Sequence, residues 1–200
     1  MESANIHSGI FMNGQVVLYQ GKCVYSSEIP TETVKKFHQM VKEDGYGFTA
    51  YNEKEFYLVE STDGAKDAYG FIHTNPPALN ADFYIDNPIN MLLFICLPPA
   101  EEKYKEAFAN LDFLRNTPYS VDVISKGNSK AEGIKRFLEY LNQEDAETYA
   151  FGDGPNDIEM LQAVTHPVAM GNAIPVLKEL AEFITTNNTD NGIINGLKYY

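Results

Sequence analysis

Two aspartates one helical turn apart form the most chemically suggestive pair in this sequence. Asp153 and Asp157 lie in the string FGDGPND at 151–157, after a short apolar run and before an amphipathic segment. Open α/β sheets bind ligands at the carboxyl ends of their strands, and the glycines beside Asp153 let the backbone approach a ligand closely. Both carboxylates can therefore reach one cation. Mg²⁺ is typically held by one or two carboxylates, several waters and a substrate phosphate.

A plainer interpretation stays open on these residues alone. A Gly-Asp-Gly string is often only a turn followed by acids that cap a helix. The helix predicted after the turn nevertheless directs its positive N-terminus toward the same crevice, which suits an anion such as phosphate.

The last third of the chain alternates between strand and helix patterns. Apolar runs at 148–151 and 168–170 read as short strands, and the stripes at 134–141, 158–164 and 176–184 read as helices. Strand, glycine turn and helix in alternation predict parallel βαβ units. The string at 151–157 then lies at the end of one of these strands.

The part of the chain before residue 125 shows a different pattern of predicted elements. A hairpin around Asn13-Gly14 is predicted at 9–19, because Asn-Gly favours the positive φ of a tight turn. The predicted helices cover 30–45, 65–73 and 98–114, and the predicted strands cover 48–51, 56–60, 91–97 and 119–124. The pattern indicates an α+β module with antiparallel strands, and it places a boundary near residue 125.

Several strings also match a known family in order and spacing. GDGPND at 152–157 resembles the fourth motif of haloacid dehalogenase-type phosphatases, and SKGNSK at 125–130 resembles the block that carries the third motif. VAMGNA at 168–173 and DNGI at 190–193 resemble the strings that follow. The chain thus resembles the Cof-like sugar-phosphate phosphatases over nearly its whole length.

This resemblance implies an α/β fold of defined organisation. Residues 1–20 and 126–200 would form a partial Rossmann-like parallel sheet core of the haloacid dehalogenase type. Residues 21–125 would form an inserted α+β cap that sets substrate specificity. The implied cofactor is Mg²⁺ and the implied partner is a small phosphorylated metabolite.

Roles for single residues also follow from the resemblance. Asp153 would be a Mg²⁺ ligand, and Asp157 would be a second ligand or would hold the water shell of the metal. Lys130 would be the catalytic lysine that also binds phosphate, neutralising the nucleophile and the transferring phosphoryl group. Asn156 would hydrogen-bond the phosphate or the substrate.

Two further residues have open alternatives. Lys126 competes with Lys130 but matches a less critical family position, so a solvated loop charge is the simpler interpretation. Asn172 either contacts the site from the next loop or only shapes its own turn.

The chain departs from the family pattern in one respect. Family members carry a DxDGT motif whose first aspartate attacks phosphorus and whose second acts as acid and base. No two aspartates stand two residues apart anywhere in the 200 residues. We therefore expect this chain to be inactive alone, and its parallel sheet to be completed by a second copy or by an N-terminal fragment.

Three hypotheses follow from that departure. The chain is part of a phosphohydrolase, or a non-catalytic module that binds phosphate and metal, or a strand-exchanged oligomer. The resemblance places the phosphohydrolase first, with this chain expected to be inactive alone, and leaves the other two as alternatives.

Composition limits the surroundings in which the chain works. A net charge of −13 argues against nucleic-acid partners and against docking on anionic membranes. The most apolar run, 91–97, is far shorter than the roughly 20 residues of a membrane helix. Two cysteines and a start without a signal-like pattern predict a cytoplasmic protein.

Overall fold

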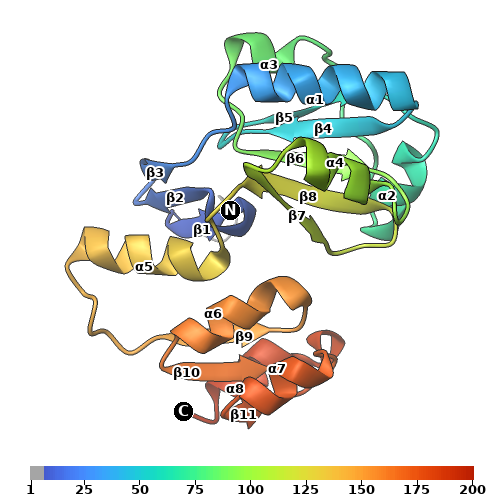
Figure 1. Cartoon of the computed structure of the whole chain (residues 1–200). Helices are drawn as coiled ribbons and strands as arrows, with labels where there is room; N and C mark the ends of the chain where they lie inside the picture. The colour runs from blue at the N-terminus through green and yellow to red at the C-terminus, as the bar shows by residue number, and fades with distance from the viewer. Residues whose placement is uncertain (1–6) are drawn as a thin grey trace. The chain divides into compact units, whose positions relative to one another are not determined.

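A computed structural model describes residues 7–200 and divides the chain into two units (Figure 1). One unit joins the N-terminal segment up to Val24 to Ser129–Tyr200, and the other consists of Tyr25–Asn128. The sequence predicted these divisions at residues 20 and 125. Among the described residues, no helix is both long enough and apolar enough to cross a membrane.

The Tyr25–Asn128 unit is built on an antiparallel sheet of five strands in the order β5-β4-β6-β8-β7. Helices cover both of its faces. The strands are β4 (Gly47–Tyr51), β5 (Phe56–Glu60), β6 (Met91–Ile95), β7 (Leu111–Arg115) and β8 (Ser120–Ser125). The helices are α1 (Thr31–Asp44), α2 (Ala65–Phe71), α3 (Phe83–Asp86) and α4 (Glu101–Ala107).

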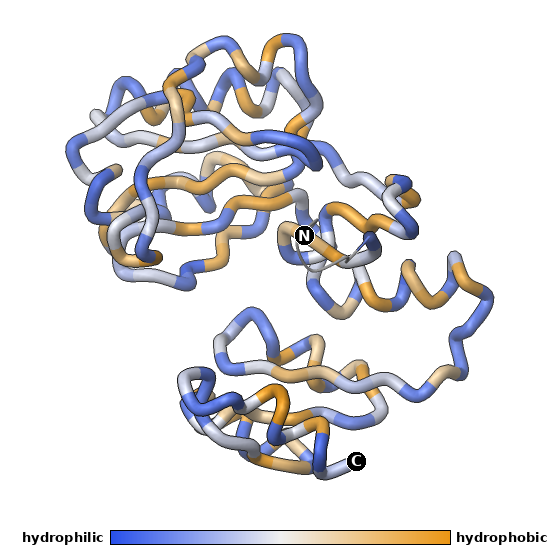
Figure 2. Tube along the Cα trace, turned by 180° about the vertical axis from the view of Figure 1, so that it is seen from behind, coloured by the Kyte–Doolittle hydropathy of each residue, from blue (hydrophilic) through white to orange (hydrophobic). Residues whose placement is uncertain are grey.

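Alternation along the strands determines which helix covers which face. Phe48 of β4 and Phe94 of β6 share one face and pack around Phe37 of α1 and Tyr104 of α4, all buried. Residues one position along, such as Ile95, point to the other face and meet α2. The apolar β6 is the middle strand of this sheet, and Figure 2 shows hydrophobic stretches of chain inside the unit.

The predicted helix at 98–114 is wrong in its second half. Helix α4 ends at Ala107, Phe108 leaves helical geometry with φ −128° and ψ 66°, and Leu111–Arg115 pairs antiparallel with β8. Tyr104, Phe108 and Leu111 all enter the same core. Their helical spacing therefore arises from a helix and a following strand that pack on the same core. Periodicity alone does not distinguish this arrangement from one continuous helix.

Two sheets of three strands are described in the other unit, and the last strand of the first sheet, β3, continues past Val24 into the Tyr25–Asn128 unit. The first has the order β1-β2-β3, where β1 is Gly9–Phe11, β2 is Val16–Tyr19 and β3 is Lys22–Ser26. Strands β1 and β2 form the predicted hairpin. The second sheet has the order β11-β10-β9, with β9 at Tyr149–Gly152, β10 at His166–Ala169 and β11 at Phe183–Ile184.

The second sheet is parallel, which confirms the βαβ prediction. Its helices are α6 (Ile158–Ala163), α7 (Pro175–Leu180) and α8 (Gly192–Leu197), and α5 (Lys130–Leu141) precedes β9. The predicted helix at 176–184 is too long, because Ala181 is extended and Phe183–Ile184 pairs with β10 instead. Pairing with a buried strand here overrides the helical spacing of the apolar residues.

The hairpin is seated on α5 through a close glycine contact. Gly14 has φ +90°, and a Cβ atom there would lie 2.0 Å from the carbonyl oxygen of Ser129. Tyr19 adds ring contacts to Phe137 and Tyr140 of α5. The turn at Asn13-Gly14 is thereby held beside the first turn of α5, which begins at Lys130.

Candidate active site

The site is assembled where β9 ends and where α5 begins. Strand β9 ends at Gly152, Asp153 follows, and a 3-10 turn at Pro155–Asp157 leads into α6. A Cβ atom on Gly152 would lie 2.7 Å from the Asp157 side chain, so only glycine permits this close return of the chain. Ser129 caps α5, because its Oγ accepts the backbone N–H of Glu132.

Lys130 and Asp157 form the central ion pair of the site. The Nζ atom of Lys130 lies 2.5 Å from Oδ1 of Asp157. The other oxygen, Oδ2, accepts the backbone N–H groups of Asp153 at 2.9 Å and Gly154 at 3.1 Å. The Asp157 side chain is 6% exposed and that of Lys130 is 32% exposed. The buried carboxylate thus fixes both the lysine and the turn that carries Asp153.

These donors determine the charge of Asp157. Burial alone raises the pKa of this carboxyl, but the Lys130 ammonium and the backbone N–H groups of Gly154 and Asp153 outweigh burial, so the net shift is downward. Asp157 is therefore ionised at neutral pH, and Lys130 has a permanent counter-charge.

Asp153 is the exposed carboxylate of the pair. Its Oδ2 accepts Nδ2 of Asn172 at 2.8 Å, and Oδ1 of Asn172 accepts the backbone N–H of Asn188 at 3.0 Å. Asn172 lies in the loop after β10, so it both shapes its loop and contacts the site. Asn172 therefore orients Asp153 toward solvent.

Asn156 contacts the first hairpin of the same unit. Its Nδ2 donates to Oδ1 of Asn13 at 3.0 Å, and Asn13 adopts left-handed geometry with φ 54°. From the sequence alone, Asn13 is expected only to form the turn of the hairpin. The one available signal, an Asn-Gly pair, marks a hairpin, and nothing in it indicates a contact with a loop 143 positions away.

The structure separates the two candidate lysines. Lys126 belongs to the Tyr25–Asn128 unit, where its Nζ donates to the carbonyl oxygen of Ala109 at 3.3 Å and the residue is exposed. Of the two lysines, Lys130 is the one that pairs with Asp157. Asp153, Asp157 and Lys130 are thus brought together, with Asn156 in the same turn.

The residues present suit a metal that needs few protein ligands. Within residues 7–200, no group of three or more histidine, cysteine or acidic side chains gathers at one point. Asp153 offers an exposed carboxylate, whereas Asp157 already accepts three hydrogen bonds. Mg²⁺ commonly keeps several waters and takes one or two carboxylates plus phosphate oxygens, so this donor set fits it as a partial site.

Comparisons with known proteins place the chain in context. The family model described as "haloacid dehalogenase-like hydrolase" matches residues 1–197. A Bacillus subtilis (strain 168) protein named "Putative phosphatase YkrA" is 35% identical over 199 residues, which cover 99% of this chain and 77% of that protein. The chain therefore spans about three quarters of the length of this relative.

Two solved structures also resemble this chain over nearly its whole length. A hypothetical protein from Geobacillus kaustophilus HTA426 is 31% identical, with a TM-score of 0.88 over 99% of this chain and 78% of its own. The HAD subclass IIB sugar phosphatase BT4131 is 26% identical, with a TM-score of 0.84 over 99% of this chain and 77% of its own. Both likenesses extend through the two units described above.

Proposed function

The chain belongs to the haloacid dehalogenase-like hydrolase family, and on that premise we propose that it supplies the Mg²⁺-binding and phosphoryl-binding part of a phosphatase for small phosphorylated metabolites. Sugar phosphates are the proposed substrate class, because a sugar phosphatase is among its structural neighbours. The observation that carries the proposal is the pairing of Lys130 with Asp157, directly beside the exposed Asp153.

Each side chain has a distinct task in this proposal. Lys130 presents a positive charge to the transferring phosphoryl group, where it stabilises negative charge that develops in the transition state. Asp157 orients that ammonium group and the turn at 153–154 through three hydrogen bonds. Asn156 is held near the site by Asn13 and binds the phosphate or the substrate.

Asp153 is the proposed protein ligand of Mg²⁺. Asn172 fixes one of its oxygens. Asp157 would act mainly on the water shell of the metal, because three donors already occupy its oxygens. When bound, Mg²⁺ would supply positive charge to the phosphate oxygens.

The Tyr25–Asn128 unit is the proposed cap. It is inserted between Val24 and Ser129, and therefore between the first hairpin and the helix that carries Lys130. We assign it the selection of the substrate. Its residues carry no general code by which one sugar phosphate is distinguished from another.

The attacking carboxylate would come from elsewhere. These 200 residues contain no Asp-x-Asp pair, so we propose that they do not hydrolyse phosphate esters alone. Among the described strands, β9 pairs only with β10, and its free edge lies next to Asp153. An N-terminal fragment or a second copy of the chain is the proposed partner that completes this edge.

A reconstitution assay tests the proposal. The chain is assayed with Mg²⁺ and a panel of hexose and pentose phosphates, alone and with a DxDGT-bearing segment fused before Met1. The fused protein is expected to hydrolyse at least one ester, and the chain alone none. Lys130→Met in the fused protein should lower kcat by about 10²- to 10³-fold. A correctly folded fusion without activity on the panel would contradict the proposal.

The pairing of Lys130 with Asp157 beside Asp153 also supports a second candidate, a non-catalytic module that binds phosphate and metal. It predicts calorimetric binding of Mg²⁺ and a sugar phosphate to the chain alone, lost in Asp153→Ala, without hydrolysis by the fusion. Light scattering tests the strand-exchanged oligomer, which predicts a dimer or larger species at low protein concentration.

A further inference from the structure

The Tyr25–Asn128 unit contains a cavity of about 690 Å³ that no part of the proposed phosphatase site uses. It opens where α1 ends at Asp44, where β4 begins after Tyr46 and where β6 ends at Ile95. Its volume lies within the range of small-molecule sites, roughly 300–1,000 Å³. It is therefore large enough for a molecule of metabolite size.

The cavity lies at the far end of the sheet from the chain connections of its own unit. Strand β8 starts at Ser120, beside the lining residue Tyr119, and ends at Ser125, close to where the unit ends at Asn128. All its lining residues fall within 44–119. It therefore shares no residue with the Lys130–Asp157 site.

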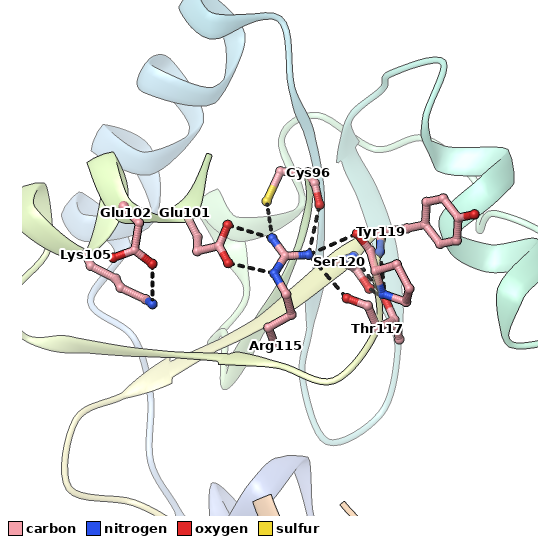
Figure 3. A network of polar contacts seen from close by, with 9 residues as sticks. Cys96, Glu101, Glu102, Lys105, Arg115, Thr117, Tyr119 and Ser120 are labelled. Atoms are coloured by element: carbon pink, nitrogen blue, oxygen red, sulfur yellow. Dashed lines mark hydrogen bonds and ion pairs between the residues drawn. The ribbon is translucent and has the colours of Figure 1, made fainter. Parts of the chain in front are cut away.

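One wall of the cavity is held rigidly by Arg115 (Figure 3). Nε and Nη2 of Arg115 donate to the two carboxylate oxygens of Glu101 at 2.6 and 2.7 Å. Nη1 donates to the carbonyl oxygen of Cys96, and Nη2 also reaches its Sγ at 3.3 Å. The segment 96–100, which lines the cavity, is thus fixed at Cys96 and at Glu101, which directly follows it. A preformed wall lowers the entropic cost of ligand binding.

The walls are mainly apolar. Leu97, Pro98, Pro99, Ile95 and Tyr119 face the cavity. Leu97 is 60% exposed, so an apolar side chain stands at its mouth. Burial raises the pKa of the Cys96 thiol to about 11 and outweighs the opposing effect of Arg115, so the thiol adds no charge at neutral pH.

The charged groups of the lining favour a cation. Lys103 lies 2.8 Å from both carboxylate oxygens of Asp44, so these two charges offset each other. Asp67, in the first turn of α2, forms no ion pair within residues 7–200. The net charge of the whole chain, −13, is negative, like the charge of Asp67. The cavity therefore repels anions and attracts positive groups.

We propose that this cavity is a second small-molecule binding site, which takes largely apolar molecules that carry one positive charge. The apolar body lies against Leu97, Pro98 and Tyr119, and the cationic group faces Asp67. Phosphorylated metabolites, the proposed substrates, are anions and are excluded from it. The two sites are therefore chemically distinct.

The glycines of this unit provide a matched pair of test variants. Gly64 lines the cavity at a negative φ, and an added Cβ atom would meet nothing closer than 3.6 Å. Gly64→Leu therefore adds an apolar side chain to the lining, and its Cβ atom meets no backbone atom within 4 Å. Gly70 lies on α2 outside the lining, with nothing within 4 Å of an added Cβ atom. Gly70→Leu is the control for adding a leucine to the same segment.

The experiment titrates the ¹⁵N-labelled full chain with three probes that share a phenyl ring. These are 2-phenylethylamine, 2-phenylethanol and 3-phenylpropanoate, which are cationic, neutral and anionic. We expect 2-phenylethylamine to shift the amide signals of Gly45 and Ala100 with a dissociation constant on the order of 1 mM. The alcohol should bind more weakly, and the anion should not shift these signals.

The variants give outcomes that decide the proposal. Gly64→Leu should abolish the shifts and Gly70→Leu should keep them. Asp67→Asn should weaken binding of the amine by about 3- to 5-fold and leave the alcohol unchanged. Absence of shifts at Gly45 and Ala100 overturns the site, as do shifts that persist in folded Gly64→Leu. Equal binding of all three probes overturns the charge preference. If Gly64→Leu fails to fold, Asp67→Asn decides the question.

Discussion

The carboxylate of Asp157 ties Lys130 to the backbone of Asp153. One oxygen accepts the lysine ammonium at 2.5 Å, and the other accepts the N–H groups of Asp153 and Gly154. A single buried side chain thereby fixes a cation from the start of α5 and a turn from the end of β9. The two aspartates of the site consequently differ in their surroundings, because Asp157 is buried and accepts three hydrogen bonds, whereas Asp153 is exposed.

This difference predicts that the alanine variant of the buried aspartate loses more stability than the alanine variant of the exposed one. Asp157→Ala should lower the free energy of unfolding by about 2–3 kcal/mol, because it leaves a partly buried ammonium and two backbone N–H groups without their acceptor. Asp153→Ala removes one exposed hydrogen bond with Asn172 and should change stability by less than about 1 kcal/mol. Urea unfolding of both variants measures this.

Metal binding should show the reverse order. In the DxDGT-fused protein, Asp153→Ala should weaken Mg²⁺ binding measured by calorimetry, because it removes the proposed ligand. The matched control is Asp145→Ala, an exposed acid in the loop before β9, which should leave Mg²⁺ affinity unchanged. Equal affinity in Asp153→Ala and in the unsubstituted fusion would argue against Asp153 as the ligand.

The free energy of unfolding should depend on acidic pH through the carboxylate of Asp157. The pKa of Asp157 is lowered in the folded chain from its ordinary value of 3.8. A carboxyl group of this kind contributes stability above its unfolded pKa and loses it as the pH falls through its folded pKa. The free energy of unfolding should therefore decrease more steeply between about pH 5 and pH 3 in the unsubstituted chain than in Asp157→Asn. Parallel curves for the two proteins would contradict this assignment.

Sequence reasoning predicted the parts of the site whose chemistry is contained in short strings. The residue types and the order of Asp153, Asp157 and Lys130 match one kind of phosphoryl-transfer site, and the structure brings the three residues together. Asn13 was not named for the site, because its contact with Asn156 depends on how the hairpin packs on α5. Such a contact arises from tertiary structure, and no local pattern encodes it.

The errors in the fold have a similar origin. Leu111 and Phe183 both continue a helical spacing of apolar residues, yet both lie in strands. At Leu111 a helix and the following strand contact one apolar core, so the spacing reports burial and not the backbone conformation. At Phe183 pairing with β10 replaces the helix. Strands such as β6, whose five residues are all apolar, were predicted correctly because they are short and lie between turn residues.

The ion pair of Arg115 with Glu101 should be far more important for stability than its exposed neighbour. Arg115→Lys keeps the charge but loses the fork to Glu101 and the contacts with Cys96, so the free energy of unfolding should fall by about 2 kcal/mol. The control is Lys105→Ala, which breaks an exposed pair with Glu102 and should cost no more than about 0.5 kcal/mol. Thermal unfolding compares the two, and equal costs would contradict a structural role for the Arg115 network.

Two helical glycines should respond oppositely to alanine. Gly133 of α5 faces the hairpin, and a Cβ atom there would lie 2.5 Å from the Ile10 side chain and 2.9 Å from the Cα atom of Gly14. Gly133→Ala should therefore destabilise the chain by about 1–3 kcal/mol through overpacking, despite the better helix propensity of alanine. Gly70→Ala in α2 meets no atom within 4 Å and should stabilise it by about 0.5–1 kcal/mol.

The Gly133→Ala variant also tests whether packing of the hairpin on α5 positions the loop at 153–157. Because Asn13 lies in the hairpin that packs on Gly133, pushing the hairpin away should disturb the contact of Asn13 with Asn156. The Nδ2 signals of Asn156 in an NMR spectrum should therefore shift in Gly133→Ala and stay in place in Gly70→Ala. Unchanged Asn156 signals in a destabilised Gly133→Ala protein would show that the hairpin stabilises α5 without positioning the loop at 153–157.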